Sequence, residues 1–204
     1  QHIETLQARG VVVHFDPVVE PVDPAPYVVT FVDPNLEAAV RSALGKPTGD
    51  ITKEDMAKLT NLVARERRIT DLSGLEYAVN LTWLNLWGNQ ITDITPLAGL
   101  TNLTTLHLPN NQITDITPLA GLTNLTTLGF WGNQITDITP LAGLTNLTWL
   151  SLGHNQITDI TPLVDNTGLD SGDEIWLNDN PLDSQAMQDI ETLRARGVIV
   201  YTVW

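Results

Sequence analysis

Five of the six tryptophans of this chain, and two of its four histidines, lie in repeated segments that each end in asparagine. An indole offers a large, rigid apolar surface, so clustered tryptophans are suited to binding. A histidine can act as a general base, but neither His107 nor His154 has an acid and a nucleophile at a suitable position in the pattern. Cysteine is absent, which excludes a thiolate nucleophile and cysteine-based metal sites. We therefore expect a binding protein with no catalytic residue, no metal and no cofactor.

Carboxylates are the other candidates for chemistry. Four of them recur at a spacing of 22 residues: Asp93, Asp115, Asp137 and Asp159. A bound cation is one interpretation of this column, but hydrogen bonds from the nearby turn backbone are favoured. A second acidic group, within residues 165–174, lacks the spacing of a calcium loop and is expected to be solvated.

The charge of the chain restricts its partners. The 204 residues include 24 acidic and 10 basic side chains, which give a formal net charge of −14. Such a charge repels phosphate backbones and anionic lipid headgroups. No apolar run approaches the roughly 20 residues that a membrane helix needs. We expect no nucleic-acid partner and no membrane insertion, and the start at Gln1 rather than Met suggests a processed protein or a piece of a longer one.

An internal repeat dominates the sequence. The string NQITDITPLAGLTNLT occurs unchanged from Asn89, Asn111 and Asn133, so the period is 22 residues. Full coils of the form L-x-x-L-x-L-x-x-N begin at residues 81, 103, 125 and 147, with Phe130 in place of one leucine. A degenerate coil begins at Leu59, and a displaced one ends at Asn180. One coil cannot bury its own leucines, whereas stacked coils share a continuous core. About six coils are expected to form a solenoid.

The alternation within each coil predicts a short strand that pairs with the strands of neighbouring coils in one parallel sheet. The asparagine after each strand is expected to be buried and to satisfy turn backbone groups. Thr95-Pro96 and its equivalents predict a short, hydroxyl-capped helical turn on the opposite side. The third, fifth, seventh and eighth positions of each coil face outward from the sheet and its edge. Arg65, Trp87 and Trp131 lie at seventh positions, and His154 lies at an eighth position. The third-position residues are Asn61, Trp83, Thr105, Thr127, Trp149 and Glu174, and the fifth-position residues are Val63, Asn85, His107, Gly129, Ser151 and Trp176.

With these 22-residue coils, the chain resembles the bacterial internalin-type leucine-rich repeat proteins over about residues 28–204. Asp33-Pro34 predicts a helix that runs to Gly45, and Thr52 to Asp55 predicts a capping box before a second helix, as in the helical N-terminal cap of that family. The resemblance implies an α/β solenoid with its parallel sheet on the concave face and helical turns on the convex face. It also implies a non-enzymatic, secreted or cell-surface binding protein.

The two ends of the chain match each other. Ile3-Glu4-Thr5-Leu6 recurs at an offset of 187 residues. We interpret residues 1–16 as the remnant of a preceding unit's cap, 17–27 as a proline-rich linker, 28–58 as the N-terminal cap, 59–182 as the repeats and 183–204 as a helix-strand cap begun by Ser184. The apolar side of residues 1–16 is expected to fold back onto its own chain, or to make a head-to-tail contact with a second copy.

Variation between the otherwise near-identical coils is concentrated at the outward positions, where specificity must lie. The candidate binding residues are Arg65, Trp83, Asn85, Trp87, His107, Trp131, Trp149, His154 and Trp176. We expect the five tryptophans to be substantially exposed and to recognise a protein partner. Carbohydrate binding on tryptophan platforms and an ice-facing threonine ladder are the alternatives.

Overall fold

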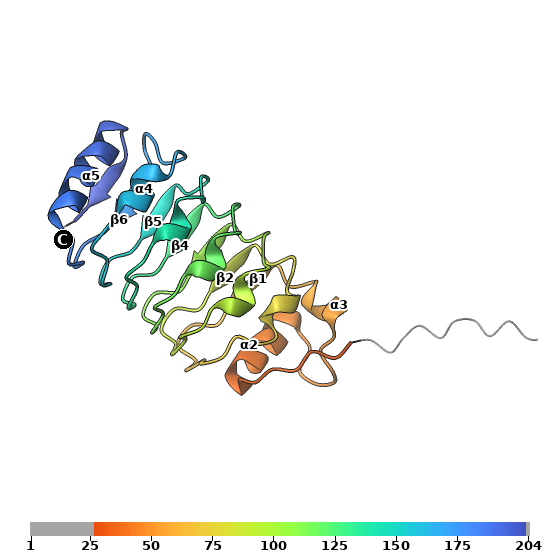
Figure 1. Ribbon diagram of the computed structural model, residues 1–204. Coiled ribbons are helices and arrows are strands. Elements are labelled where there is room, and N and C mark those ends of the chain that lie inside the picture. The colour runs from red at the N-terminus through yellow and green to blue at the C-terminus, as the bar shows by residue number, and fades with distance from the viewer. Residues whose placement is uncertain (1–26, 203–204) are drawn as a thin grey trace, which may run out of the picture.

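A computed structural model describes residues 27–202 and contains one sheet of seven parallel strands arranged in sequence order (Figure 1). The strands are β1 (Asn61–Val63), β2 (Trp83–Asn85), β3 (Thr105–His107), β4 (Thr127–Gly129), β5 (Trp149–Ser151), β6 (Glu174–Trp176) and β7 (Ile199–Tyr201). From β1 to β6, the partners in the sheet are the residues expected at the third and fifth coil positions, for example Trp149 with Glu174 and Ser151 with Trp176. The leucine-rich-repeat solenoid is confirmed.

The returning arcs of the coils contain short helical turns that stack on the side opposite the sheet (Figure 1). They are η1 (Leu75–Tyr77), η2 (Thr95–Leu97), η3 (Thr117–Leu119), η4 (Thr139–Leu141) and α4 (Thr161–Asp165). The expected threonine cap is wrong. Thr95 is the first residue of its turn, and its N–H donates to Asp93 Oδ1 at 2.8 Å. The aspartate column therefore holds these turns through local hydrogen bonds, the favoured interpretation of the sequence.

The repeated asparagines tie each coil to the one before it. Asn133 is 6% exposed; its Oδ1 accepts from Ile113 N–H at 3.0 Å, and its Nδ2 donates to Leu108 O and Phe130 O at 3.0 and 2.9 Å. The equivalent Asn89 serves the degenerate first coil, where the N–H groups of Arg67 and Ile69 both donate to its Oδ1. The buried structural role expected for these amides is confirmed.

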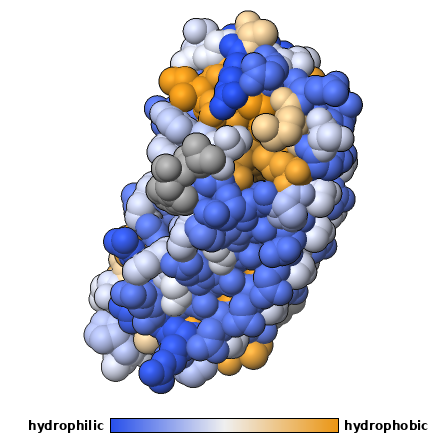
Figure 2. Space-filling model, turned by 90° about the vertical axis from the view of Figure 1, so that its left-hand side faces the viewer, coloured by the Kyte–Doolittle hydropathy of each residue, from blue (hydrophilic) through white to orange (hydrophobic). Residues whose placement is uncertain are grey.

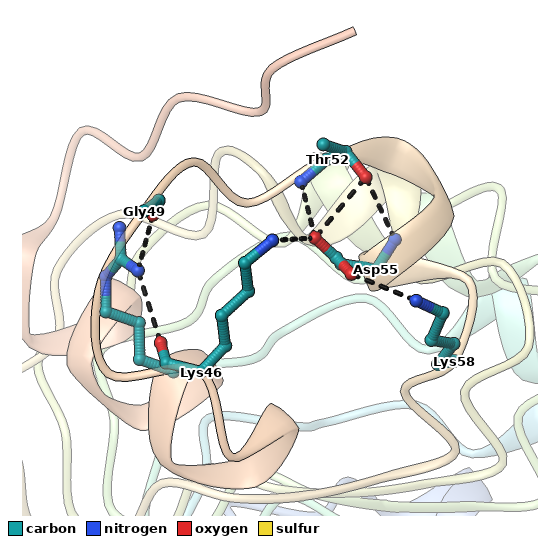
Figure 3. Close-up of polar contacts among 6 residues, drawn as sticks. Lys46, Gly49, Thr52, Asp55 and Lys58 are labelled. Carbon is teal, nitrogen blue, oxygen red and sulfur yellow. Dashed lines mark hydrogen bonds and ion pairs between the residues drawn. The ribbon is translucent and has the colours of Figure 1, made fainter. Parts of the chain in front are cut away.

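The N-terminal end of the core is closed by two helices, α2 (Pro34–Leu44) and α3 (Lys53–Met56). Asp33 caps α2 and also accepts from Thr70 N–H at 2.8 Å, which joins this region to the first coil. Thr52 and Asp55 form the expected capping box, and Figure 3 shows Lys46 and Lys58 both directed at the Asp55 carboxylate. These contacts, with the Lys46 hydrogen bond the largest, hold the pKa of Asp55 well below its ordinary value.

The other end is closed by α5 (Ser184–Ala195) and β7. The N-cap of α5 is Asp183 rather than Ser184, since the Asp183 carboxylate accepts from Ala186 N–H at 2.7 Å. Figure 2 views the molecule from the side on which α5 lies and shows hydrophobic atoms gathered near the top, whereas most of this face is hydrophilic. The cap remnant expected at residues 1–16 and nearly all of the linker expected at 17–27 lie outside the described residues.

The core is a continuous stack of leucine and isoleucine side chains between the sheet and the helical turns. Phe130, which takes a leucine position, is fully buried in it. In the part of the chain that the structure describes, no helix is long and apolar enough to cross a membrane.

Candidate functional site

The sheet brings the candidate residues onto one outward face. Five of them lie in strands, Trp83, Asn85, His107, Trp149 and Trp176, and the other four lie two or three residues after a strand. None of the five tryptophans is buried in the core, but each is partly rather than fully exposed. The expectation of substantial exposure is therefore only partly met, because the rings lean on side chains of neighbouring coils.

Over β1 to β3, aromatic and basic side chains pack against one another. The Arg65 guanidinium lies 5.4 Å from the ring centre of Trp87. The His107 ring lies edge-on to Trp83, with 6.3 Å between ring centres, and edge-on to Trp149, with 5.9 Å between ring centres. It therefore links two tryptophans that lie three coils apart. Burial, and to a lesser extent the charge of Arg65, lower the pKa of His107. The lowered pKa favours the neutral imidazole, which here makes aromatic contacts.

Over β4 to β7, three tryptophans surround a hollow of about 280 Å³. Its lining residues are Trp131, Trp149, Ser151, Trp176 and Asn178. Glycine creates the space between them: a Cβ at Gly153 would lie 2.6 Å from Asn178 Oδ1 and 2.9 Å from Trp131 Cδ1. At Gly129, a Cβ would lie 3.5 Å from the Trp149 ring. Gly153 therefore leaves room for the Trp131 ring and the Asn178 side chain, whereas a Cβ at Gly129 would make only an ordinary van der Waals contact with the Trp149 ring.

Neighbouring side chains hold these walls in place. The Trp131 ring contacts His154 edge-on, with 4.7 Å between ring centres. His154 Nε2 lies 3.0 Å from Asp179 Oδ2. Trp176 stacks on Tyr201 with 3.9 Å between ring centres. Sequence reasoning missed Tyr201, although the strand expected after residue 197 and the alternation along it could have placed Tyr201 beside Trp176. It also left Ser151 and Asn178 out of the binding set.

Two polar atoms at the hollow have no hydrogen-bond partner within the described residues. They are Trp131 Nε1, a donor, and Asn178 Oδ1, an acceptor, and both atoms are buried. Buried polar groups are nearly always satisfied in folded proteins, so such a pair marks a place where a ligand could supply the missing partners. Among residues 27–202, the histidine and acidic side chains form no group of three or more that could hold a metal ion.

The stacked 22-residue coils, with one parallel sheet and short helical turns opposite it, define a leucine-rich-repeat protein. The family model for leucine-rich repeats (two copies) matches residues 79–121, 101–143 and 123–165. No curated protein matches the chain by sequence.

Similar solved structures show which family of leucine-rich-repeat proteins the chain resembles. An internalin C2 of Listeria monocytogenes is 33% identical, with 89% of this chain and 99% of that chain covered and a TM-score of 0.54. An internalin, InlF, of the same species is 30% identical, with 90% of this chain covered and a TM-score of 0.70, and this chain spans 60% of its length. A leucine-rich-repeat protein of Leptospira interrogans, 24% identical with a TM-score of 0.53 over 76% of this chain and 40% of that one, shares the fold. The chain belongs to the bacterial internalin-type leucine-rich-repeat family.

Proposed function

We propose that the chain is a non-catalytic recognition module that binds a protein partner through its tryptophan-rich concave face. The observation that carries the proposal is the contrast between the two sides of each strand. The inward leucines hardly change from coil to coil, whereas the outward positions vary and gather five tryptophans on one face. Tryptophan is the residue type most enriched in binding hot spots, where side chains contribute about 2 kcal/mol or more.

Membership of the internalin-type family supports a protein-interaction module and a secreted or cell-surface location, which we include in the proposal. The head-to-tail self-contact through residues 1–16 remains a separate expectation, because that segment lies outside the described residues.

A capture experiment with matched variants tests the proposal. The chain is immobilised and exposed to surface and secreted proteins, and each retained protein is then purified and its affinity measured. The double variant Trp83→Ala, Trp149→Ala should weaken binding by tenfold or more. Thr114→Ala changes an exposed residue outside the sheet and should leave the affinity within twofold. A partner that binds both variants as tightly as the wild type does not use this face, and that result would refute the proposal.

A glycan array examines the competing carbohydrate function with the same three proteins. Signal from a defined glycan that disappears in the double variant, without any protein partner, would favour sugar recognition. Fold controls by circular dichroism apply to every variant.

A further inference from the structure

The charged residues are distributed very unevenly along the array. Residues 69–193 contain no lysine or arginine, yet they contain fourteen aspartates and glutamates. Apart from Arg9, the basic residues that precede this stretch lie in the N-terminal cap and first coil, and those that follow it are Arg194 and Arg196 in the C-terminal cap. The repeats from the second to the sixth coil therefore present a negative field to anything that approaches their concave face.

The tryptophan hollow lies within this negative stretch, and acidic residues lie next to its walls. Glu174 is the cross-strand partner of Trp149, so the two side chains leave the same face of neighbouring strands. Asp179 directly follows Asn178, and its carboxylate lies 3.0 Å from His154, which contacts Trp131. The hollow thus combines three indole walls with carboxylates close by, and the faces of indole rings attract cations.

The same concave face already holds one organic cation against an indole. The Arg65 guanidinium lies 5.4 Å from the ring centre of Trp87. Among the described residues, no lysine or arginine lies over the rings of Trp131 or Trp149. The described residues therefore supply no equivalent guanidinium to these two rings.

We propose that the hollow lined by Trp131, Trp149, Ser151, Trp176 and Asn178 receives an arginine side chain of the protein partner. The inference rests on the proposed function and names the chemistry at its centre. A guanidinium N–H donates to the unpartnered Asn178 Oδ1, and the guanidinium plane stacks between indoles. A backbone carbonyl of the same partner segment accepts from Trp131 Nε1.

Arginine fits these features better than other cations or a sugar. A quaternary ammonium group has no N–H to donate to Asn178. A lysine ammonium is more strongly hydrated than a guanidinium and presents no plane to stack on an indole. A neutral sugar could satisfy the donor and the acceptor, but it would gain nothing from the negative field of the array.

Peptide probes on the wild-type protein provide the first test. The probes are acetyl-Gly-Gly-Arg-Gly-Gly-amide and the same peptide with citrulline or lysine in place of arginine, and the readout is the indole N–H signals in NMR titrations. Citrulline keeps the planar N–H donors and loses the charge. The arginine peptide should bind with a Kd on the order of a millimolar, and the citrulline and lysine peptides should bind at least fivefold more weakly. Equal or tighter binding of either peptide, or no binding of the arginine peptide, would overturn the proposal.

Paired variants then locate the site. Trp149→Leu keeps an apolar side chain at the hollow and should weaken binding of the arginine peptide at least fivefold. Trp87→Leu on the same face should change the affinity for that peptide less than twofold. Glu174→Gln should weaken binding two- to fivefold. Asp165→Asn removes the same charge from the end of α4, on the opposite side, and should have little effect. If the two members of either pair behave alike, the arginine site is not in this hollow.

The results separate this inference from the proposed function. A protein partner that is captured on the concave face but binds equally well after its arginines are blocked with a dicarbonyl reagent supports the general function and refutes the arginine site. Selective arginine-peptide binding with no captured protein supports the hollow and contradicts the proposed function.

Discussion

Replacing Asn133 with alanine probes the asparagine ladder, and the structure allows its cost to be worked out atom by atom. Three backbone groups lose a bond to the side chain: Ile113 N–H, Leu108 C=O and Phe130 C=O. Both carbonyls keep a second partner, because Asn111 Nδ2 also donates to Leu108 O and Asn155 Nδ2 to Phe130 O. The Ile113 N–H has Asn133 Oδ1 as its partner, so this one buried donor is left unsatisfied.

An unsatisfied buried donor costs about 1–3 kcal/mol, and each of the two lost hydrogen bonds contributes about 0.5–1.5 kcal/mol. We therefore expect Asn133→Ala to lower the free energy of unfolding by about 2–6 kcal/mol. Asn124→Ala is a matched control in the preceding coil. Asn124 also donates to a backbone carbonyl, Thr101 O at 2.8 Å, but it is exposed, so water replaces the lost bond and the expected cost is below about 1 kcal/mol.

Urea denaturation followed by far-ultraviolet circular dichroism measures both free energies, and hydrogen exchange measures protection of the Ile113 amide. We expect that amide to lose protection in Asn133→Ala and to keep it in Asn124→Ala. Equal destabilisation by the two substitutions, or an unchanged exchange rate at Ile113, would refute the view that the buried amide joins one coil to the next.

Three further outcomes are expected. Leu106→Ala, at a fully buried core position, should cost about 2–5 kcal/mol in urea denaturation, and Trp131→Ala should cost about 1 kcal/mol; the reverse order would give Trp131 a structural role. Asp55→Asn should lower stability at pH 7 by about 1 kcal/mol, and the gap should narrow as the pH falls below 3.8, because a carboxylate with a lowered pKa stabilises the fold above that value and loses this effect on protonation. In NMR titrations, His107 should have a pKa below 6.5, and Arg65→Gln should raise it only part of the way, because burial is the larger cause.

The architecture could be predicted from the sequence because the repeat determines it. Once the coils are aligned, a period of two within the strand decides which residue faces the core, and stacking fixes the register, so Trp149 had to lie beside Glu174. The buried amides followed from the same alignment. These inferences require only knowing which residues occupy equivalent positions in different coils, and the 22-residue repeat shows this directly.

From the sequence, the candidate site could be predicted only as the outward face of the sheet, without the hollow that lies on it. The hollow depends on Gly153, which leaves room for the Trp131 ring of the neighbouring coil, and the direction in which an indole leans depends on side-chain packing rather than on periodicity. Local turn geometry was also missed where two residues competed for one role. Asp93 and Asp183, rather than the nearby hydroxyl residues Thr95 and Ser184, accept the N–H groups at the starts of their turns.

The parallel register has a mechanical consequence. Because each strand bonds only to its neighbours in sequence order, the hydrogen bonds of the sheet point along the long axis of the array. A tension applied between its two ends pulls these bonds apart in series, from the outermost coil inward, instead of shearing many at once. Each released coil of 22 residues lengthens the chain by about 75 Å when it is drawn out. The array should therefore yield in small, nearly equal steps, and a ligand that bridges the second to sixth coils should suppress those steps and raise the force at which the array first yields.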